Sequence, residues 1–204
     1  MLCQNRGRHG AYASWAIWAP PSGAPKSNMG DLEVLDADTN PALLGSQNPG
    51  VVMVGLNSSR AFPDVPFRNF HDPSAVAKDF KIRFACRDTV FWGAYMTDVI
   101  KDFVEPVSER LLDHLRANPQ FVRAHMDTLR AELADLVHPR PAVLAFGHTV
   151  HDLLNKHLRP YEYLHLVPNT HNSHRISKEK YRDTVRAQIH EDNKRSGLEK
   201  GKLR

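Results

Sequence analysis

Four short segments of the sequence concentrate side chains that donate hydrogen bonds or titrate. Each lies in or directly after an apolar run, and they read GLNSSR at 55–60, TDVIKD at 97–102, GHTVHD at 147–152 and PNTHNSHRIS at 168–177. If the apolar runs are neighbouring strands, the polar residues meet at one edge of a sheet. The four segments therefore predict one shared site rather than four separate loops.

Metal binding is one chemistry that these segments could support. His171 and His174 have the spacing His-x-x-His, and so do His148 and His151. A structural or catalytic zinc site needs three or four ligands, and the sequence shows no further ligand beside either pair. The spacing also arises readily by chance among 12 histidines. We therefore expect no metal and no other cofactor.

The surrounding pattern predicts the elements that position these residues. Strands are expected at 51–56, 93–100, 142–147 and 162–168. Helices are expected at 107–117, 120–137, 148–158 and 177–192. The last helix has Ser177 as its expected N-cap and Glu179 in its first turn. Alternating strands and helices favour a three-layer α/β/α sandwich with a four-stranded, mainly parallel sheet. Ligands of such sheets bind beyond the carboxyl ends of the strands.

Length and composition limit the class of protein. The 204 residues suit one domain, expected at 26–191, after an unplaced segment at 1–25 and before a basic flexible tail at 192–204. A formal charge of +4 and a pI near 9.1 suit phosphate-bearing partners. Two cysteines exclude a disulfide framework and a thiolate-held iron–sulfur cluster, and the sequence lacks a membrane span. We expect a cytoplasmic monomer.

Two of the loops together resemble motifs of the uracil-DNA glycosylase superfamily. Residues 55–59, GLNSS, correspond to its Gly-x-Asn-Pro-Gly, and residues 171–175, HNSHR, correspond to its His-Pro-Ser-Pro followed by a wedge residue. Between them, YMTDVIKDFVEP at 95–106 is similar to the Gly-Ile-Thr-Asp-Leu-Val stretch of the mismatch-specific branch. The ordered resemblance spans roughly residues 48–190.

This resemblance implies a monofunctional DNA glycosylase that flips uracil or a related deaminated or damaged base out of DNA and hydrolyses its N-glycosidic bond. His171 would donate to the departing base, and Asn57 would hold the attacking water. Phe67 or Phe70 would stack on the base, and Asp98 would face it. The expected DNA-binding residues are Ser58, Ser59, Ser173, His174 and Arg175.

The sequence departs from the family motifs at three places. Ser58 and Ser59 replace Pro-Gly, and Asn172 and His174 replace both prolines of the second motif. Asp98 stands near the position where uracil-reading branches have asparagine. An ionised aspartate only accepts hydrogen bonds, so either the base is not uracil or Asp98 is structural.

Three other functions stay open at the sequence level. The altered motifs are compatible with a non-catalytic nucleic-acid-binding member of the same fold. An enzyme acting on a small nucleotide or nucleoside would need neither the basic tail nor Arg175. A metal-dependent hydrolase is the third alternative.

Overall fold

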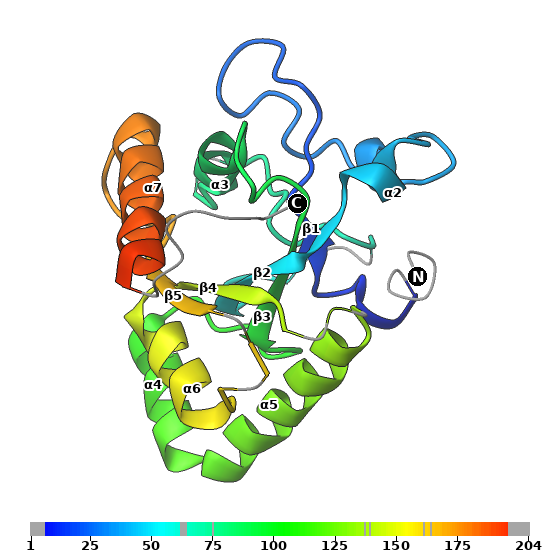
Figure 1. Ribbon diagram of the computed structural model, residues 1–204. Helices are drawn as coiled ribbons and strands as arrows, with labels where there is room; N and C mark the ends of the chain where they lie inside the picture. The colour runs from blue at the N-terminus through cyan, green and yellow to red at the C-terminus, as the bar shows by residue number, and fades with distance from the viewer. Residues whose placement is uncertain are drawn as a thin grey trace.

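The structure, a computed structural model, describes residues 7–61, 65–74, 76–136, 138, 140–160, 162–163 and 165–195, with side chains at 165–169 and 188–195 left out. Within these residues one sheet has the strand order β1-β3-β2-β4-β5 (Figure 1). Its strands are β1 (Ser14–Trp15), β2 (Asn48–Asn57), β3 (Ala94–Ile100), β4 (Ala142–Phe146) and β5 (His165–Asn169). Strands β3, β2, β4 and β5 are parallel, and β1 is antiparallel to β3.

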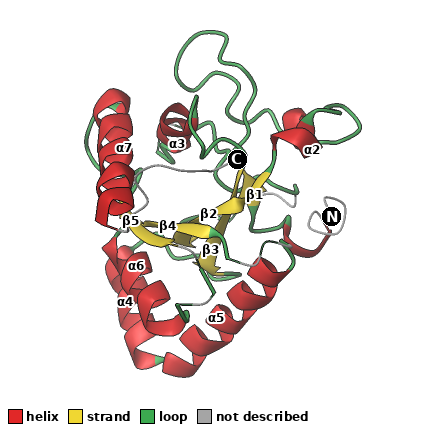
Figure 2. Ribbon diagram, in the orientation of Figure 1, coloured by secondary structure: helices red, strands yellow, loops and turns green. Residues whose placement is uncertain are grey.

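Helices lie on both sides of this sheet. Figure 2, in the same view as Figure 1, shows α3 and α7 on one side and α4, α5 and α6 on the other. The helical elements are η1 (Glu33–Leu35), α2 (Leu43–Ser46), α3 (Asp79–Cys86), α4 (Ser108–Ala117), α5 (Pro119–Ala134), α6 (His148–His157) and α7 (Lys178–Arg195).

The central strand β2 is apolar on both faces because each face covers a separate hydrophobic cluster. Val52 and Val54 join the cluster that includes α4, α5 and α6, while Val51 and Met53 join the one that includes α3. Successive side chains of a strand point to opposite faces, so a strand covered on both sides reads as one continuous apolar run. This explains why β2 shows no alternation in the sequence.

The predicted α/β class and the four mainly parallel strands are confirmed, but the sheet has a fifth strand. Trp15 of β1 pairs with Tyr95 of β3, so part of the segment at 1–25 belongs to the sheet. Residues 13–19 are buried. The short helix α3 was also not predicted, and it proves central to the site.

The last helix begins as predicted and ends later than predicted. The Ser177 hydroxyl accepts a hydrogen bond from the Lys180 N–H at 3.1 Å, and Glu179 lies in the first turn. Helix α7 continues to Arg195, so the prediction of a tail from 192 was wrong for residues 192–195. The remainder of that predicted tail, 196–204, lies outside the described residues.

Chain direction determines where a ligand can enter. The chain runs from β2 to β3 on one side, and then crosses to β4 and β5 on the other side of β2. Loops leaving the carboxyl ends of β2 and β4 therefore separate, which leaves a crevice at this switch point. All four polar segments of the sequence analysis lie at or directly after the carboxyl ends of parallel strands at this edge.

A buried ion pair supports β3 just below this edge. Lys101 and Glu132 of α5 are 2.7 Å apart, with side chains 2% and 0% exposed. The Lys101 ammonium also donates to Thr97 Oγ1 and to the Asp98 carbonyl, and the Tyr95 hydroxyl donates to Glu132 at 2.6 Å. The end of β3 is thereby fixed to α5 by charged groups.

In the part of the chain described here, none of the helices combines the length and the apolar character that crossing a bilayer demands.

Candidate functional site

A cavity of about 440 Å³ opens at the carboxyl ends of the parallel strands. Its walls come from all four predicted loops, from the 69–79 segment and from the start of α4. The predicted site residues that line it are Asn57, Ser58, Ser59, Phe70, Asp98, His171 and Ser173. The prediction that these loops share one site is thus supported by their geometry.

Asn57, the last residue of β2, has a side-chain orientation fixed by backbone carbonyls. Its Nδ2 donates to the carbonyls of Ser58, Phe103 and Glu105 at 2.9, 3.3 and 3.1 Å. If the amide were rotated by 180°, its oxygen would face these three carbonyl oxygens and could not bond to them. Only the orientation with Nδ2 toward the carbonyls forms hydrogen bonds. Oδ1 is therefore the atom left to accept a hydrogen bond from a ligand or water in the cavity.

His171 has a tautomer that its neighbours determine. The Ser173 backbone N–H lies 3.1 Å from Nδ1, and the Ser173 hydroxyl lies 2.7 Å from the same atom. A backbone N–H can only donate, so Nδ1 must be the unprotonated acceptor and Nε2 carries the hydrogen. His171 is an exposed residue, but the protein groups around its ring displace part of the water, which lowers its pKa below the ordinary value and favours the neutral ring. The imidazole therefore offers a single donor, Nε2–H.

The loop that carries His171 is attached to α3 and the residues just before it. The Asn172 amide donates to the Ala77 carbonyl at 3.1 Å and to Asp79 at 3.3 Å. Two lysine ammonium groups, those of Lys78 and Lys81, donate to the carbonyls of residues 173 and 174 at 3.1 and 2.7 Å. These contacts fix the position of the loop, although residues 170–177 contain no proline.

Asp98 lies within the cavity wall and is only 4% exposed. Its Oδ2 accepts a hydrogen bond from Asn69 Nδ2 at 2.8 Å. Its Oδ1 lies over Gly55, where a Cβ would come within 2.2 Å of that oxygen. Glycine at 55 therefore makes room for the carboxyl group of Asp98.

The two candidate phenylalanines differ in their contact with the cavity. Both are buried and belong to hydrophobic core clusters, but Phe70, 9% exposed, also lines the cavity beside Gly55, whereas Phe67, 1% exposed, does not line it. The prediction that Phe67 could contact a base was therefore wrong, because its ring is enclosed by the core. Both residues have φ of 64°, a left-handed conformation that bulky residues rarely adopt. Because both residues share this conformation and only Phe70 lines the cavity, the backbone strain alone does not identify the site residue.

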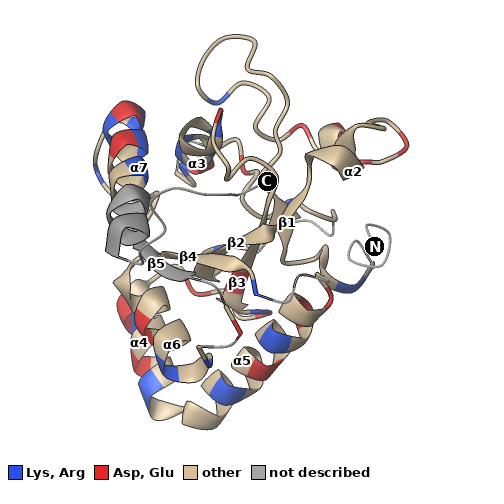
Figure 3. Ribbon diagram, viewed as in Figure 1, with Lys and Arg blue, Asp and Glu red and all other residues tan. Residues whose placement is uncertain are grey.

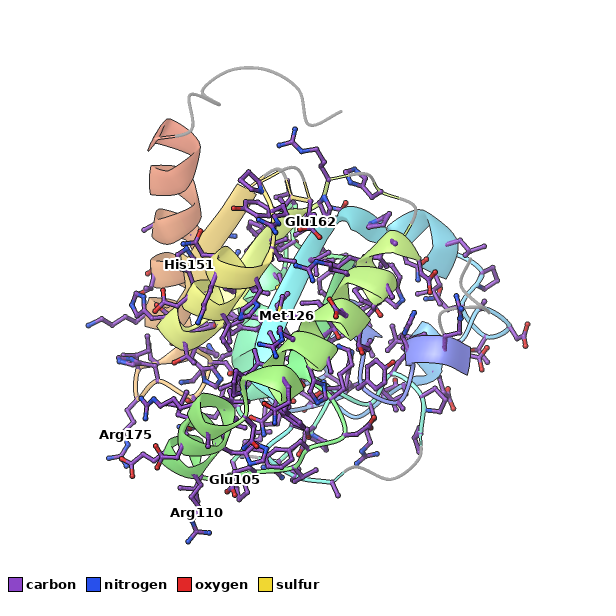
Figure 4. All side chains as sticks on the ribbon, turned by 90° about the horizontal axis from the view of Figure 1, so that it is seen from below. Glu105, Arg110, Met126, His151, Glu162 and Arg175 are labelled. Carbon is purple, nitrogen blue, oxygen red and sulfur yellow. The ribbon has the colours of Figure 1, made fainter. Side chains whose placement is uncertain are left out.

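His174 and Arg175 do not line the cavity, and both are exposed. Figure 4 shows Arg175 at the periphery of the molecule. Gly147, with φ of 91°, starts the turn into α6 next to His171, and it brings His148 to the cavity wall.

Sequence reasoning missed the polar residues of the 69–79 segment. Asp72 pairs with Arg60 at 2.9 Å, and Asp79 accepts a hydrogen bond from the Asp72 N–H at 3.0 Å. Burial raises the pKa of Asp79 to about 7 and that of Asp98 to about 6. The only signal in the sequence was the run Asn-Phe-His-Asp at 69–72, next to the phenylalanines already considered.

A larger hollow of about 950 Å³ lies elsewhere, against Trp18, Trp92 and the exposed side of α3. None of the predicted site residues lines it. We therefore place the site in the smaller cavity, where donors, acceptors and carboxyl groups converge.

Among the described residues, no group of three or more histidine, cysteine, aspartate or glutamate side chains is arranged to hold a metal ion. His151 instead lies 3.4 Å from Asp152. The two His-x-x-His pairs therefore gain no support as a metal site.

No protein-family model, curated protein or solved structure matches this chain. Function has to be inferred from the cavity and its side chains.

Proposed function

We propose that the protein is a DNA glycosylase that takes a damaged base into the 440 Å³ cavity and hydrolyses its N-glycosidic bond. One observation carries the proposal: a neutral imidazole donor, His171 Nε2–H, and an amide acceptor, Asn57 Oδ1, are both held by backbone atoms at the same cavity. Hydrolysis of an N-glycosidic bond needs this pair of functions.

The reaction assigns one role to each group. Asn57 Oδ1 accepts a hydrogen bond from a water molecule, whose oxygen forms a bond to C1′ of the sugar. The C1′–N bond breaks, and its electron pair remains on the base. His171 Nε2–H stabilises the negative charge that develops on a base oxygen or nitrogen, and the proton lost by water neutralises the departing base. The products are the free base and a sugar with a hydroxyl at C1′.

Phe70 provides the face on which the base stacks, an interaction worth about 1–3 kcal/mol in single-stranded nucleic-acid binding. Burial raises the pKa of Asp98 and of Asp79, and carboxyl groups with shifted pKa values are common in enzyme active sites.

Contacts to DNA phosphates would come from the rim of the cavity. Ser59 lies there, and the exposed side chains of His174 and Arg175 lie beside it on the His171 loop. Ser58 and Ser173 also line the cavity, but their hydroxyls already donate to the Arg60 carbonyl and to His171 Nδ1. Figure 3 shows basic and acidic residues interspersed along α4, α5 and α7. We expect few phosphate contacts and hence a shallow dependence of DNA affinity on salt.

The test is base release from oligonucleotides containing uracil, hypoxanthine, xanthine, mismatched thymine or an oxidised pyrimidine. His171→Ala and Asn57→Ala should each reduce release by about 100-fold or more, the scale found when one positioned donor of an active site is removed. His151→Ala is the matched control, because this histidine of α6 lies outside the cavity lining and has no role in the proposed reaction or in DNA binding.

Three outcomes separate the possible functions. Release that falls in both cavity variants but not in His151→Ala supports the glycosylase. DNA binding without release from any oligonucleotide would instead favour a non-catalytic binding protein. Release from free nucleosides but not from DNA would favour an enzyme of small nucleosides.

A further inference from the structure

Asp98 presents one oxygen to the cavity while its other oxygen is occupied. Oδ2 accepts from Asn69 at 2.8 Å. Oδ1 lies over the α-carbon of Gly55 and receives no hydrogen bond from any described residue. The Phe70 ring reaches the same spot, since its Cζ would be 3.4 Å from a Cβ at Gly55. A base stacked on Phe70 therefore has Oδ1 as its polar neighbour.

The Asn69 side chain cannot be reversed. Its Nδ2 also donates to the Tyr12 carbonyl at 2.8 Å, and its Oδ1 accepts from the Phe70 N–H at 3.1 Å. A flipped amide would place oxygen against the carbonyl and NH₂ against the N–H, so both bonds would be lost. Asn69 is thus a fixed donor, and the atom of Asp98 that faces it must be an acceptor.

The charge state of Asp98 determines which groups of a base its Oδ1 can bind. Burial, with a smaller contribution from Glu132, raises the pKa of Asp98 to about 6. The Asn69 hydrogen bond and the nearby Lys101 act in the opposite direction and lower this pKa. Above neutral pH the carboxyl is mainly ionised, so Oδ1 is an acceptor with negative charge. A base carbonyl placed there would meet like charge, whereas an amino group would form a charge-assisted hydrogen bond.

We propose that Asp98 reads the base, and that it selects damaged bases that keep an exocyclic amino group over their keto counterparts. This assignment rests on the glycosylase function proposed above, and it narrows the substrate class of the same cavity. Uracil carries a carbonyl at position 4, so it becomes a disfavoured base when Oδ1 faces that position rather than N3–H.

The first measurement compares two oxidised pyrimidines, 5-hydroxycytosine, in which N3 accepts a hydrogen bond, and 5-hydroxyuracil, in which N3–H donates one; they also differ at position 4. 5-Hydroxycytosine has an amino group there, and 5-hydroxyuracil has a carbonyl. The wild-type protein should release 5-hydroxycytosine at least about tenfold faster, because an unpaired acceptor in a buried site costs roughly a tenfold or larger factor. Equal release, or faster release of 5-hydroxyuracil, would overturn the assignment.

The decisive variant is Asp98→Asn. The fixed donor of Asn69 requires an oxygen beside it, so the new NH₂ group must occupy the place of Oδ1. The position of Oδ1 then carries a hydrogen-bond donor instead of an acceptor. The variant should therefore release 5-hydroxyuracil faster than 5-hydroxycytosine. Asp72→Asn is the control, because it removes another cavity carboxylate, one paired with Arg60, and should leave the ratio of the two rates unchanged.

The affinities of the protein for free 5-hydroxycytosine and for free 5-hydroxyuracil are measured by calorimetry. This measurement tests the role of Asp98 independently of the proposed glycosylase function. A preference for 5-hydroxycytosine that inverts in Asp98→Asn supports base reading by Asp98 even where no bond is cleaved, and the absence of cleavage would then count against the glycosylase alone. A preference that stays the same in a folded Asp98→Asn variant, checked by thermal melting, would overturn the role of Asp98 whether or not the protein cleaves DNA.

Discussion

Replacing Lys101 by methionine should destabilise the protein strongly, because it leaves the carboxylate of Glu132 buried without a counter-charge. The two side chains are 2% and 0% exposed, and their charged atoms are 2.7 Å apart. Removing one partner of such a pair typically costs about 3–5 kcal/mol. For a chain of this length each kcal/mol lowers the Tm by roughly 2–4 °C, so the expected fall is roughly 6–20 °C.

The assay is thermal unfolding followed by circular dichroism. Arg116→Met is the matched control, since Arg116 forms an ion pair with Asp113 at 2.9 Å but both side chains are more than two-thirds exposed. Its Tm should equal that of the wild type within error, because exposed pairs contribute little. Combining Lys101→Met with Glu132→Leu should recover much of the loss, since no charge then remains buried.

A fall in Tm of less than about 2 °C in Lys101→Met would refute this reasoning, because it corresponds to about 1 kcal/mol or less at this size. It would mean that water reaches Glu132 in solution.

Three further predictions concern the cavity. Gly55→Ala places a Cβ 2.2 Å from Asp98 Oδ1 and should cost about 1–3 kcal/mol in urea unfolding, whereas Gly45→Ala, whose Cβ would meet nothing within 4 Å, should cost far less. Nitrogen NMR of His171 should show an unprotonated Nδ1 at neutral pH and a pKa below the ordinary 6.5; a pKa at or above that value would contradict the desolvation argument. Asp79 has a folded pKa near 7 against 3.8 ordinarily, so the native state holds this proton more tightly, and the stability it contributes is lost as pH rises through 7. The difference in unfolding free energy between about pH 5 and about pH 8 should therefore shrink in Asp79→Asn, and an unchanged difference would argue against burial as the cause.

The parallel strands could be predicted because each is a short apolar run that ends in polar or turn residues. β1 could not, since Ser14 and Trp15 form a strand only through pairing with Met96 and Tyr95 of β3. Nothing in the local sequence AYASWAIWAP distinguishes two paired residues from their apolar neighbours. Pairing with a distant strand, rather than local propensity, makes this segment a strand.

The site residues at strand ends were predictable for the same reason. Asn57 and His171 follow apolar runs, so their position at the sheet edge follows from the pattern. Asn69, Asp72 and Asp79 come from an irregular loop and from the start of α3, and only tertiary contacts bring them to the cavity. Phe67 and Phe70 could not be told apart from the sequence, because the segment FPDVPFRNF has no periodicity that assigns either ring to the core or to the cavity.

The attachment of the His171 loop to α3 has a consequence for the order in which the molecule loses structure. The hydrogen bonds from Lys78, Lys81 and Asn172 join parts of the chain 93–95 residues apart. β5 pairs with β4 alone, at the edge of the sheet, and α7 packs on α3 through a small cluster around Tyr181. Such a terminal unit can open as one cooperative piece while the central strands stay folded. Activity should then disappear at a lower denaturant concentration than the bulk of the secondary structure, and it should return last on refolding.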